Sequence, residues 1–197
     1  MSTSSERKIR AIVIGASAGG IKALLVILKK LPASFRLPII VVLHVPEDRE
    51  SKLAEVFQYH LEMKVQQAQD KEWIKPGTVY FAGSGYHLSI EQDFSFSLSC
   101  EEPECFARPS IDILMQSAAD AYGTDLAGFL LSGANHDGAA GLASIKAAGG
   151  FTVVQDPAEA EAAIMPQTAI NICRPDRIMT LHEIHLFIAD LENTYGN

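Results

Sequence analysis

The sequence lacks most of the features that mark secreted, zinc-binding or membrane-spanning proteins. Its 197 residues include only three cysteines, Cys100, Cys105 and Cys173, and none of them stands in a C-x-x-C pair. We therefore expect neither a disulfide framework nor a cysteine-ligated zinc site. No apolar run approaches the roughly 20 residues that cross a bilayer. The first residues, 1–8, are polar and contain no apolar signal segment, which predicts a cytoplasmic protein.

Positive charge is also scarce. Sixteen lysines and arginines stand against 24 aspartates and glutamates, so the formal net charge is −8. This balance disfavours general binding to nucleic acid or to anionic membranes. The hydrophobic fraction of 48% is that of a globular chain. Since no repeat or linker interrupts the sequence, we expect a single domain over residues 1–197, with residues 1–9 flexible.

Apolar runs alternate with helical patterns along the chain. Continuous apolar runs predict buried strands at about 10–14, 38–43, 125–131 and 151–154. Helices are expected at about 19–30, 51–60 with Ser51 as the N-cap, 110 onward with Ser110 as the N-cap, 139–148, 166 onward and 181–191. Shorter runs at 65–69, 78–82, 87–90 and 94–98 predict a small antiparallel insertion. Strands that alternate with helices imply a parallel sheet and an α/β fold.

The first predicted strand runs into a turn of small residues in which only Ser17 carries reactive chemistry. Residues 15–19 (GASAG) match the G-x-S-x-G pattern of a nucleophile elbow, and the helix behind the turn offers free N–H groups. The same residues are compatible with two alternative roles. Gly15, Ser17 and Gly20 also stand where a dinucleotide fingerprint has three glycines. A turn of small residues is also compatible with a purely structural role in packing.

Three of the predicted strands lead into polar residues that a core does not need, namely Ser17, His44 and, after a short loop, Asp137. The carboxyl ends of parallel strands meet at one edge of the sheet, where ligands bind. A serine, a histidine and an aspartate at that edge can serve as a nucleophile, a base and a group that orients the base. Each is also compatible with a simpler role, as a turn residue, a solvent-facing strand end or a helix cap.

Rival assignments exist for the base and for the fold. His136 adjoins Asp137 and is an alternative base, and the set Ser17, Asp137 and His182 has the residue order of α/β-hydrolases. That fold places its elbow after a central strand, however, whereas Ser17 follows the first strand. Dinucleotide binding expects an acidic residue at the end of the second strand, where His44 stands. We therefore favour Ser17, His44 and Asp137 as the catalytic set.

Seven stretches of the chain follow, in order, the pattern of a known protein family. They are residues 14–20 (IGASAGG), 42–46 (VLHVP), 79–82 (VYFA), 86–88 (YHL), 108–112 (RPSID), 131–141 (LSGANHDGAAG) and 154–157 (VQDP). In these stretches the chain resembles the catalytic domain of the CheB family of protein-glutamate methylesterases of bacterial chemotaxis. The resemblance implies a doubly wound, mainly parallel sheet in three layers, with a small antiparallel hairpin beside it. It places the family's nucleophile, histidine and aspartate on Ser17, His44 and Asp137.

The resemblance also implies an activity. The family hydrolyses γ-glutamyl methyl esters on methylated chemoreceptor-like proteins, and some members also deamidate receptor glutamines. Ser17 would attack the ester carbonyl with His44 as base, and backbone N–H groups at Ala18 and in the Ala134 loop would stabilise the oxyanion. This mechanism requires no metal and no cofactor. It involves no nucleic acid, and it involves a membrane only through the receptor.

Departures from the family pattern keep a second hypothesis open. Residues Ala134-Asn135-His136 replace the usual Met-Gly-Asn before the aspartate, and residues 162–167 lack the usual arginine. The usual N-terminal receiver domain is not found before Ala11, so we expect regulation by a separate regulatory or receiver protein. The alternative hypothesis is a catalytically weak module that binds receptor-like helices or acts as a signalling scaffold.

Overall fold

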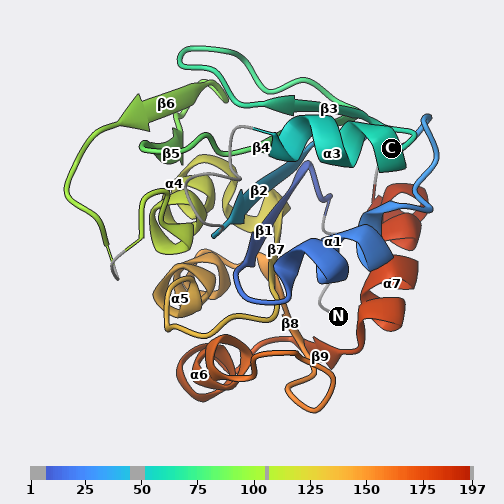
Figure 1. The fold of residues 1–197 in the computed structure, drawn as a ribbon, viewed down its shortest axis with the longest axis vertical. Helices are drawn as coiled ribbons and strands as arrows, with labels where there is room; N and C mark the ends of the chain where they lie inside the picture. The colour runs from blue at the N-terminus through green and yellow to red at the C-terminus, as the bar shows by residue number, and fades with distance from the viewer. Residues whose placement is uncertain (1–7, 45–51, 105–106, 196–197) are drawn as a thin grey trace, which may run out of the picture.

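The computed structural model describes residues 8–44, 52–104 and 107–195, and a seven-stranded sheet forms its centre (Figure 1). All seven strands are parallel, in the spatial order β3-β4-β2-β1-β7-β8-β9. Their bounds are β1 Ala11–Ala16, β2 Ile39–Leu43, β3 Lys64–Gln67, β4 Thr78–Phe81, β7 Leu126–Leu130, β8 Phe151–Gln155 and β9 Arg177–Met179. Two further strands, β5 (His87–Ile90) and β6 (Phe96–Ser99), form a separate antiparallel hairpin.

The central strands are apolar along their whole length because helices cover both faces of the sheet. Every residue of β1, β2 and β7 is buried. Ile14 of β1 pairs with Val41 of β2 on one side and with Phe129 of β7 on the other. The continuous apolar runs in the sequence thus correspond to the middle of the sheet.

Helices on the two faces complete three layers (Figure 1). The helices on one face are α1 (Gly20–Leu28), α3 (Leu53–His60) and α7 (Leu181–Tyr195), and those on the other are α4 (Ile111–Tyr122), α5 (Ala139–Ala147) and α6 (Ile164–Cys173). A short 3-10 helix, η1 (Gly123–Asp125), leads into β7. The hairpin shares the core of the second face through Leu88, Ile90 and Phe96. This arrangement confirms the predicted doubly wound, three-layer α/β fold with a small hairpin.

The strand order also fixes where a ligand site can form. The chain builds β2 on one side of β1, and β7 and β8 on the other. The direction of winding therefore reverses between β1 and β7, and open α/β sheets bind ligands outside the carboxyl ends of the strands at such a point. The segments after β1, β2 and β7 meet there, as the strand-end argument predicts.

The predicted antiparallel insertion was too large. The runs at 65–69 and 78–82 form β3 and β4, which are parallel members of the main sheet rather than parts of the hairpin. Strand β4 is buried throughout and pairs with β2, so it needs helices on both faces and not a hairpin partner. Only β5 and β6 are antiparallel. The hairpin turn includes Phe94 with a left-handed backbone (φ 63°), so β6 begins at Phe96 and not at residue 94.

Several helix boundaries differ from the predicted ones. Helix α6 begins at Ile164, two residues before Pro166, because a proline in the first turn removes an N–H that has no partner in the helix. Strand β9 was not predicted, since it has three residues and lies at the edge of the sheet. Ser110 caps α4 as predicted, with its side chain accepting from the Ile113 N–H. The predicted cap at Ser51 lies outside the described residues.

The N-terminal part of the chain is described from residue 8 onward. Ile9 is already buried, and the N–H of Arg10 donates to the carbonyl of Asp125 at 2.7 Å. Across the described residues, no helix is both long enough and apolar enough to span a lipid bilayer.

Candidate active site

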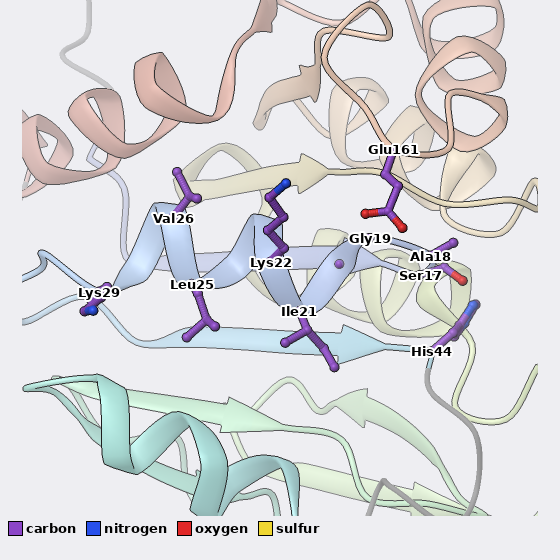
Figure 2. A pocket seen from close by; sticks show the side chains of 11 residues that line it. Ser17, Ala18, Gly19, Ile21, Lys22, Leu25, Val26, Lys29, His44 and Glu161 are labelled. Carbon is purple, nitrogen blue, oxygen red and sulfur yellow. The ribbon is translucent and has the colours of Figure 1, made fainter.

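Ser17 lies in the turn between β1 and α1. Gly19 caps α1 with a left-handed backbone (φ 78°), and the Gly20 N–H donates to the Ser17 carbonyl at 2.8 Å. The Ser17 N–H donates to the carbonyl of Ser132, which follows β7, at 2.9 Å. The turn is thereby attached to the neighbouring strand. Ser17 and His44 line the same cavity, of about 630 Å³ (Figure 2).

The glycines of this turn are required by packing within the protein. A Cβ atom on Gly15 would overlap the side chain of Ile111 in α4, and a Cβ atom on Gly20 would overlap the side chain of Leu43. A dinucleotide site instead uses its second glycine to let a pyrophosphate approach the backbone, and Ser17 occupies that position. The structure therefore favours a nucleophile turn over a dinucleotide fingerprint.

His44 follows β2 and is held by its own backbone, since its N–H donates to the carbonyl of Ala16 at 3.0 Å. The ring atom Nε2 lies 3.0 Å from Oδ2 of Asp137, which is short enough for a hydrogen bond but not well aligned for one. The other ring nitrogen, Nδ1, lies 3.4 Å from the side-chain amide nitrogen of Asn135. A proton on Nε2 faces the carboxylate and leaves the lone pair on Nδ1, which is the state that a general base needs.

Asp137 is fully buried, and its carboxylate accepts hydrogen bonds from the start of α4. Oδ1 accepts from the Ser110 hydroxyl and from the Asp112 N–H, each at 2.9 Å, and Oδ2 accepts from the Ile111 N–H at 2.7 Å. Burial opposes ionisation, but hydrogen bonds from His44 and from these backbone groups outweigh it and hold the pKa of Asp137 below its ordinary value. The carboxylate therefore stays ionised beside the imidazole.

A capping role for Asp137 exists, but it applies to a different helix from the expected one. The helix that follows it, α5, has Gly138 as its N-cap, with a left-handed backbone (φ 88°) and no capping side chain. Asp137 instead bonds the first N–H groups of α4, more than 20 residues earlier in the chain. Its position therefore combines a structural contact to α4 with a contact to His44.

His87 is a buried residue of the site that the sequence did not reveal. Its Nδ1 accepts a hydrogen bond from the Ser110 N–H at 3.1 Å, so Nε2 carries the hydrogen and donates to the Glu102 carbonyl at 3.1 Å. Ser110 in turn donates its hydroxyl hydrogen to Asp137. A chain of contacts thus runs from the hairpin through Ser110 to the carboxylate. The one sequence signal was that His87 and Ser110 lie in two of the family-like stretches.

Asp112 is a second buried carboxyl group beside Asp137, and its role was also missed. Its Oδ1 accepts a hydrogen bond from the Gly141 N–H at 2.6 Å. Burial raises the pKa of Asp112 to about 6, assisted by the negative charge of Asp137 and opposed by the Gly141 N–H. In the sequence, Asp112 stands out only as part of the family-like stretch 108–112, without a role of its own.

The two predicted oxyanion donors have different positions. Ala18 is exposed, lines the cavity beside Ser17, and has its carbonyl fixed by the Ser132 hydroxyl at 2.6 Å. Ala134 is also exposed, but it is not one of the residues that line this cavity. Neither backbone N–H has a hydrogen-bond partner in the described part of the chain. The N–H of Ala18 is thus the better placed of the two.

The rival histidines lie elsewhere. His136 is exposed, and its Nδ1 lies 3.2 Å from the hydroxyl of Thr168 on α6. His182, in the first turn of α7, lines an adjoining cavity of about 230 Å³ that shares part of its wall, including Glu161, with the cavity of Ser17. Neither residue is among those lining the cavity that contains Ser17 and His44. The structure therefore favours His44 over both.

The described residues offer no evident metal centre. Within the ranges 8–44, 52–104 and 107–195, no group of three or more histidine, cysteine, aspartate or glutamate side chains is placed to hold a metal ion. Cys100 and Cys173 are free thiols. Cys105 lies outside the described residues.

The chain is similar to proteins of one family. A family model described as CheB methylesterase matches residues 12–188. A protein of Leptospira interrogans is 46% identical over 179 residues, which cover 90% of this chain and 93% of that protein. Protein-glutamate methylesterase/protein-glutamine glutaminase 1 of Carboxydothermus hydrogenoformans is 38% identical over 178 residues, or 88% of this chain, and the chain spans about half of that relative (52%).

A solved structure agrees with these matches. The crystal structure of the Thermotoga maritima CheB methylesterase catalytic domain superimposes with a TM-score of 0.88 at 30% sequence identity, covering 93% of this chain and 98% of that one. Both the sequence and the fold therefore match over most of the chain. This chain belongs to the CheB methylesterase family.

Proposed function

We propose that this protein is a protein-glutamate methylesterase that hydrolyses γ-glutamyl methyl esters on chemoreceptor-like proteins, with glutamine deamidation as a second activity. The observation that carries the proposal is that Ser17 and His44 line one cavity, with His44 Nε2 3.0 Å from the Asp137 carboxylate. Relatives from Carboxydothermus hydrogenoformans and Pseudomonas aeruginosa are named protein-glutamate methylesterase/protein-glutamine glutaminase, which supports this substrate class.

In the first half of the proposed reaction, the Ser17 hydroxyl oxygen attacks the ester carbonyl carbon, and Nδ1 of His44 takes the hydroxyl proton. The ionised Asp137 stabilises the resulting imidazolium through Nε2. The Ala18 N–H stabilises the oxyanion, with the Ala134 N–H as the second candidate donor. When the ester C–O bond breaks, His44 gives the proton to the leaving oxygen. Methanol departs, and a glutamyl ester remains on Ser17.

In the second half, a water molecule attacks this glutamyl ester while His44 takes one of its protons. The bond between the carbonyl carbon and the Ser17 oxygen then breaks, and His44 returns the proton to that oxygen. The products are a free glutamate side chain and the original enzyme. A glutamine substrate follows the same steps and releases ammonia in place of methanol. The steps use only groups of this chain and water.

The biological setting is part of the proposal. We propose that residues 1–197 act as a single domain in the cytoplasm, on the cytoplasmic helices of a membrane-bound receptor. The match to the family over residues 12–188 supports a single catalytic unit. A separate regulatory or receiver protein is proposed to control its activity, and no nucleic acid takes part.

The test is release of methanol from a methylated cytoplasmic fragment of a chemoreceptor, with Ser17→Ala as the matched control. A serine-directed fluorophosphonate should also form a covalent adduct, which mass spectrometry of the digested protein should place on Ser17. We expect methanol release by the parent protein only. A parent protein that neither releases methanol nor forms the adduct would refute the proposed function.

One contact favours a second candidate, a catalytically weak module that binds receptor-like helices or acts as a signalling scaffold. The Asn135 side-chain amide nitrogen lies 3.4 Å from His44 Nδ1. A hydrogen bond from this amide would occupy the lone pair that the proposed mechanism needs for the Ser17 proton. Asn135 belongs to the altered Ala134-Asn135-His136 loop. Under this candidate, Asn135→Gly should raise the rate of fluorophosphonate labelling at Ser17. An unchanged labelling rate would remove the observation that favours it.

A further inference from the structure

A groove leads away from Ser17 along the outer surface of α1. Besides Ser17 and His44, its wall consists of Glu161, the turn at 18–20, and the α1 side chains Ile21, Lys22, Leu25, Val26 and Lys29. Figure 2 shows Ser17, His44 and Glu161 at one end of the groove and Lys29 at the other. Helix α1 has nine residues and is therefore about 14 Å long, which matches about two and a half turns of a second helix laid along it.

The floor of the groove is apolar and uncovered. Val26 is 44% exposed, Ile21 is 37% exposed and Leu25 is half-buried, whereas Leu24 and Ile27 on the opposite side of α1 are fully buried. Ile21 and Leu25 stand four residues apart on the helix and so form one ridge. An exposed apolar surface that continues into a reactive cavity is typical of a site where a partner binds.

Two lysines, Lys22 and Lys29, stand on the rim of the groove, although the whole chain has a net charge of −8. Lys22 and Lys29 are exposed, and neither forms an ion pair with a carboxylate of the described residues. Attraction to these two lysines therefore favours an acidic partner.

The reactive end of the groove has the opposite charge. Glu161 is exposed and stands beside the Ser17 turn, because a Cβ atom on Gly19 would come within 3.2 Å of its carboxylate oxygen. An ionised glutamate is repelled there, whereas a neutral ester or amide is not. The groove thus accepts a neutral group next to Ser17 and negative groups further along, near Lys22 and Lys29.

We propose that this groove docks the helical segment of the substrate protein that flanks the reacting glutamyl group. The proposal rests on the proposed esterase function and extends it to the recognition of the substrate. The methyl ester enters at Ser17, apolar side chains of the substrate helix cover Ile21, Leu25 and Val26, and its ionised glutamates lie near the two lysines. The helix-in-groove mode explains why both apolar and basic groups line one side of α1.

The experiment measures binding and turnover separately. Binding is measured by fluorescence anisotropy on Ser17→Ala protein, with a labelled helical peptide of about 20 residues that carries one glutamate γ-methyl ester and, on the same face, leucines and glutamates. A second peptide has lysines in place of the ionised glutamates. Turnover is measured on protein with Ser17 intact, using a methylated receptor fragment and p-nitrophenyl acetate as a small ester.

Two groove variants have matched controls elsewhere on the surface. Val26→Asp is compared with Val56→Asp, because Val56 is 45% exposed on α3 and does not line the groove. Lys29→Glu is compared with Lys30→Glu, the next residue, which is exposed but also does not line the groove. Circular dichroism melting curves of all four variants check that the fold is retained.

We expect Val26→Asp to weaken binding of the acidic peptide at least tenfold and Lys29→Glu to weaken it about threefold to tenfold. Lys29→Glu should also strengthen binding of the lysine peptide, which a loss of folding cannot do. Both groove variants should lower the turnover of the receptor fragment and leave the rate of p-nitrophenyl acetate hydrolysis within twofold of the parent rate. The control variants should change neither peptide binding nor the turnover of either substrate.

Two results would overturn the docking proposal. The first is that the groove variants bind the acidic peptide as their controls do. The second is that they slow the small ester as much as the receptor fragment, because the groove would then belong to the reaction site. Failure of the esterase function gives a different result, in which the intact protein turns over neither substrate while peptide binding still depends on Val26 and Lys29.

Discussion

Replacing Asp112 by asparagine should make this protein more stable at neutral pH, although Asp112 is buried and hydrogen-bonded. The main reason is burial, which penalises the charged form of the Asp112 carboxyl, and the negative charge of Asp137 adds to this penalty. Asparagine has nearly the same shape, and its side-chain oxygen can still accept the hydrogen bond from the Gly141 N–H. Its amide can also donate to Asp137. The substitution thus removes a charge and keeps the packing.

The expected size follows from the raised pKa of Asp112, which is about 6 in the folded protein against an ordinary value of 3.8. Between these two values the folded protein holds a proton that the unfolded chain has lost, so the free energy of unfolding falls as pH rises from about 4 to about 6. At about 1.4 kcal/mol for each pKa unit, the cost at neutral pH is on the order of 2–3 kcal/mol. Asp112→Asn should recover a large part of this cost.

The assay is urea denaturation of the parent and Asp112→Asn proteins from pH 4.5 to pH 8. The variant should gain stability relative to the parent as pH rises through about 4 to 6, and the difference should be constant above that range. Asp120→Asn is the control, since Asp120 lies on the same helix but is exposed. Its effect should stay below about 0.5 kcal/mol at every pH. A difference for Asp112→Asn that does not change with pH, or a variant less stable than the parent at pH 8, would refute this reasoning.

Three further predictions concern the reaction itself. Ser17→Ala should lower the initial rate of methanol release by about a thousandfold or more, because it removes the nucleophile. Its melting temperature should be unchanged, because the Ser17 hydroxyl has no hydrogen-bond partner within the described ranges. A variant with the parent rate would rule out this nucleophile. His44→Gln should abolish activity, while His136→Gln should stay within twofold of the parent rate of methanol release, because His44 is the proposed base. The opposite ranking would make His136 the base. Asp137→Asn should lower the rate of methanol release at least tenfold, which is about 1.4 kcal/mol of transition-state stabilisation. It should also lower the free energy of unfolding by about 1–3 kcal/mol. An unchanged rate and an unchanged melting curve would exclude Asp137 from the catalytic set.

The predicted loss of stability for Asp137→Asn comes from the structure and not from the sequence. Both oxygens of Asp137 accept hydrogen bonds: Oδ1 from Ser110 and Asp112, and Oδ2 from Ile111, while Oδ2 also faces His44 Nε2 at 3.0 Å. An asparagine has one oxygen, so its NH₂ group must face a pair of donors. An exchange that a simple helix cap tolerates therefore costs a hydrogen bond at this position.

The edge of the sheet where the site lies could be predicted from sequence because the fold brings strand ends together. Apolar runs that stop at Ser17 and His44, or shortly before Asp137, indicate parallel strands, and parallel strands align their carboxyl ends. That inference needs no knowledge of the loops. It fails for β3 and β4, because a strand of four residues has too short a pattern to distinguish a parallel partner from an antiparallel one.

The groups that hold the carboxylate could not be predicted in the same way. His87 acts through a backbone N–H of Ser110, and Asp112 acts through its closeness to Asp137. These contacts depend on how the hairpin and α4 pack against the sheet, and residue type and spacing carry no information on that packing. Ser110 illustrates the limit, because its cap was predicted correctly while its bond to Asp137 was not.

The packing around Ile111 has a consequence for how this sequence can change over evolution. Together with Leu130, its side chain fills the space that a Cβ atom would need on Gly15 and the space that a Cβ atom would need on Gly138. The N–H of the same residue donates to Asp137. The residues at positions 15, 111 and 138, which lie far apart in the chain, therefore constrain one another. Among homologues, a larger residue at position 15 should be accompanied by a smaller residue at position 111, so that α4 keeps its distance from the carboxylate. Gly138 should stay glycine, because its backbone is left-handed (φ 88°).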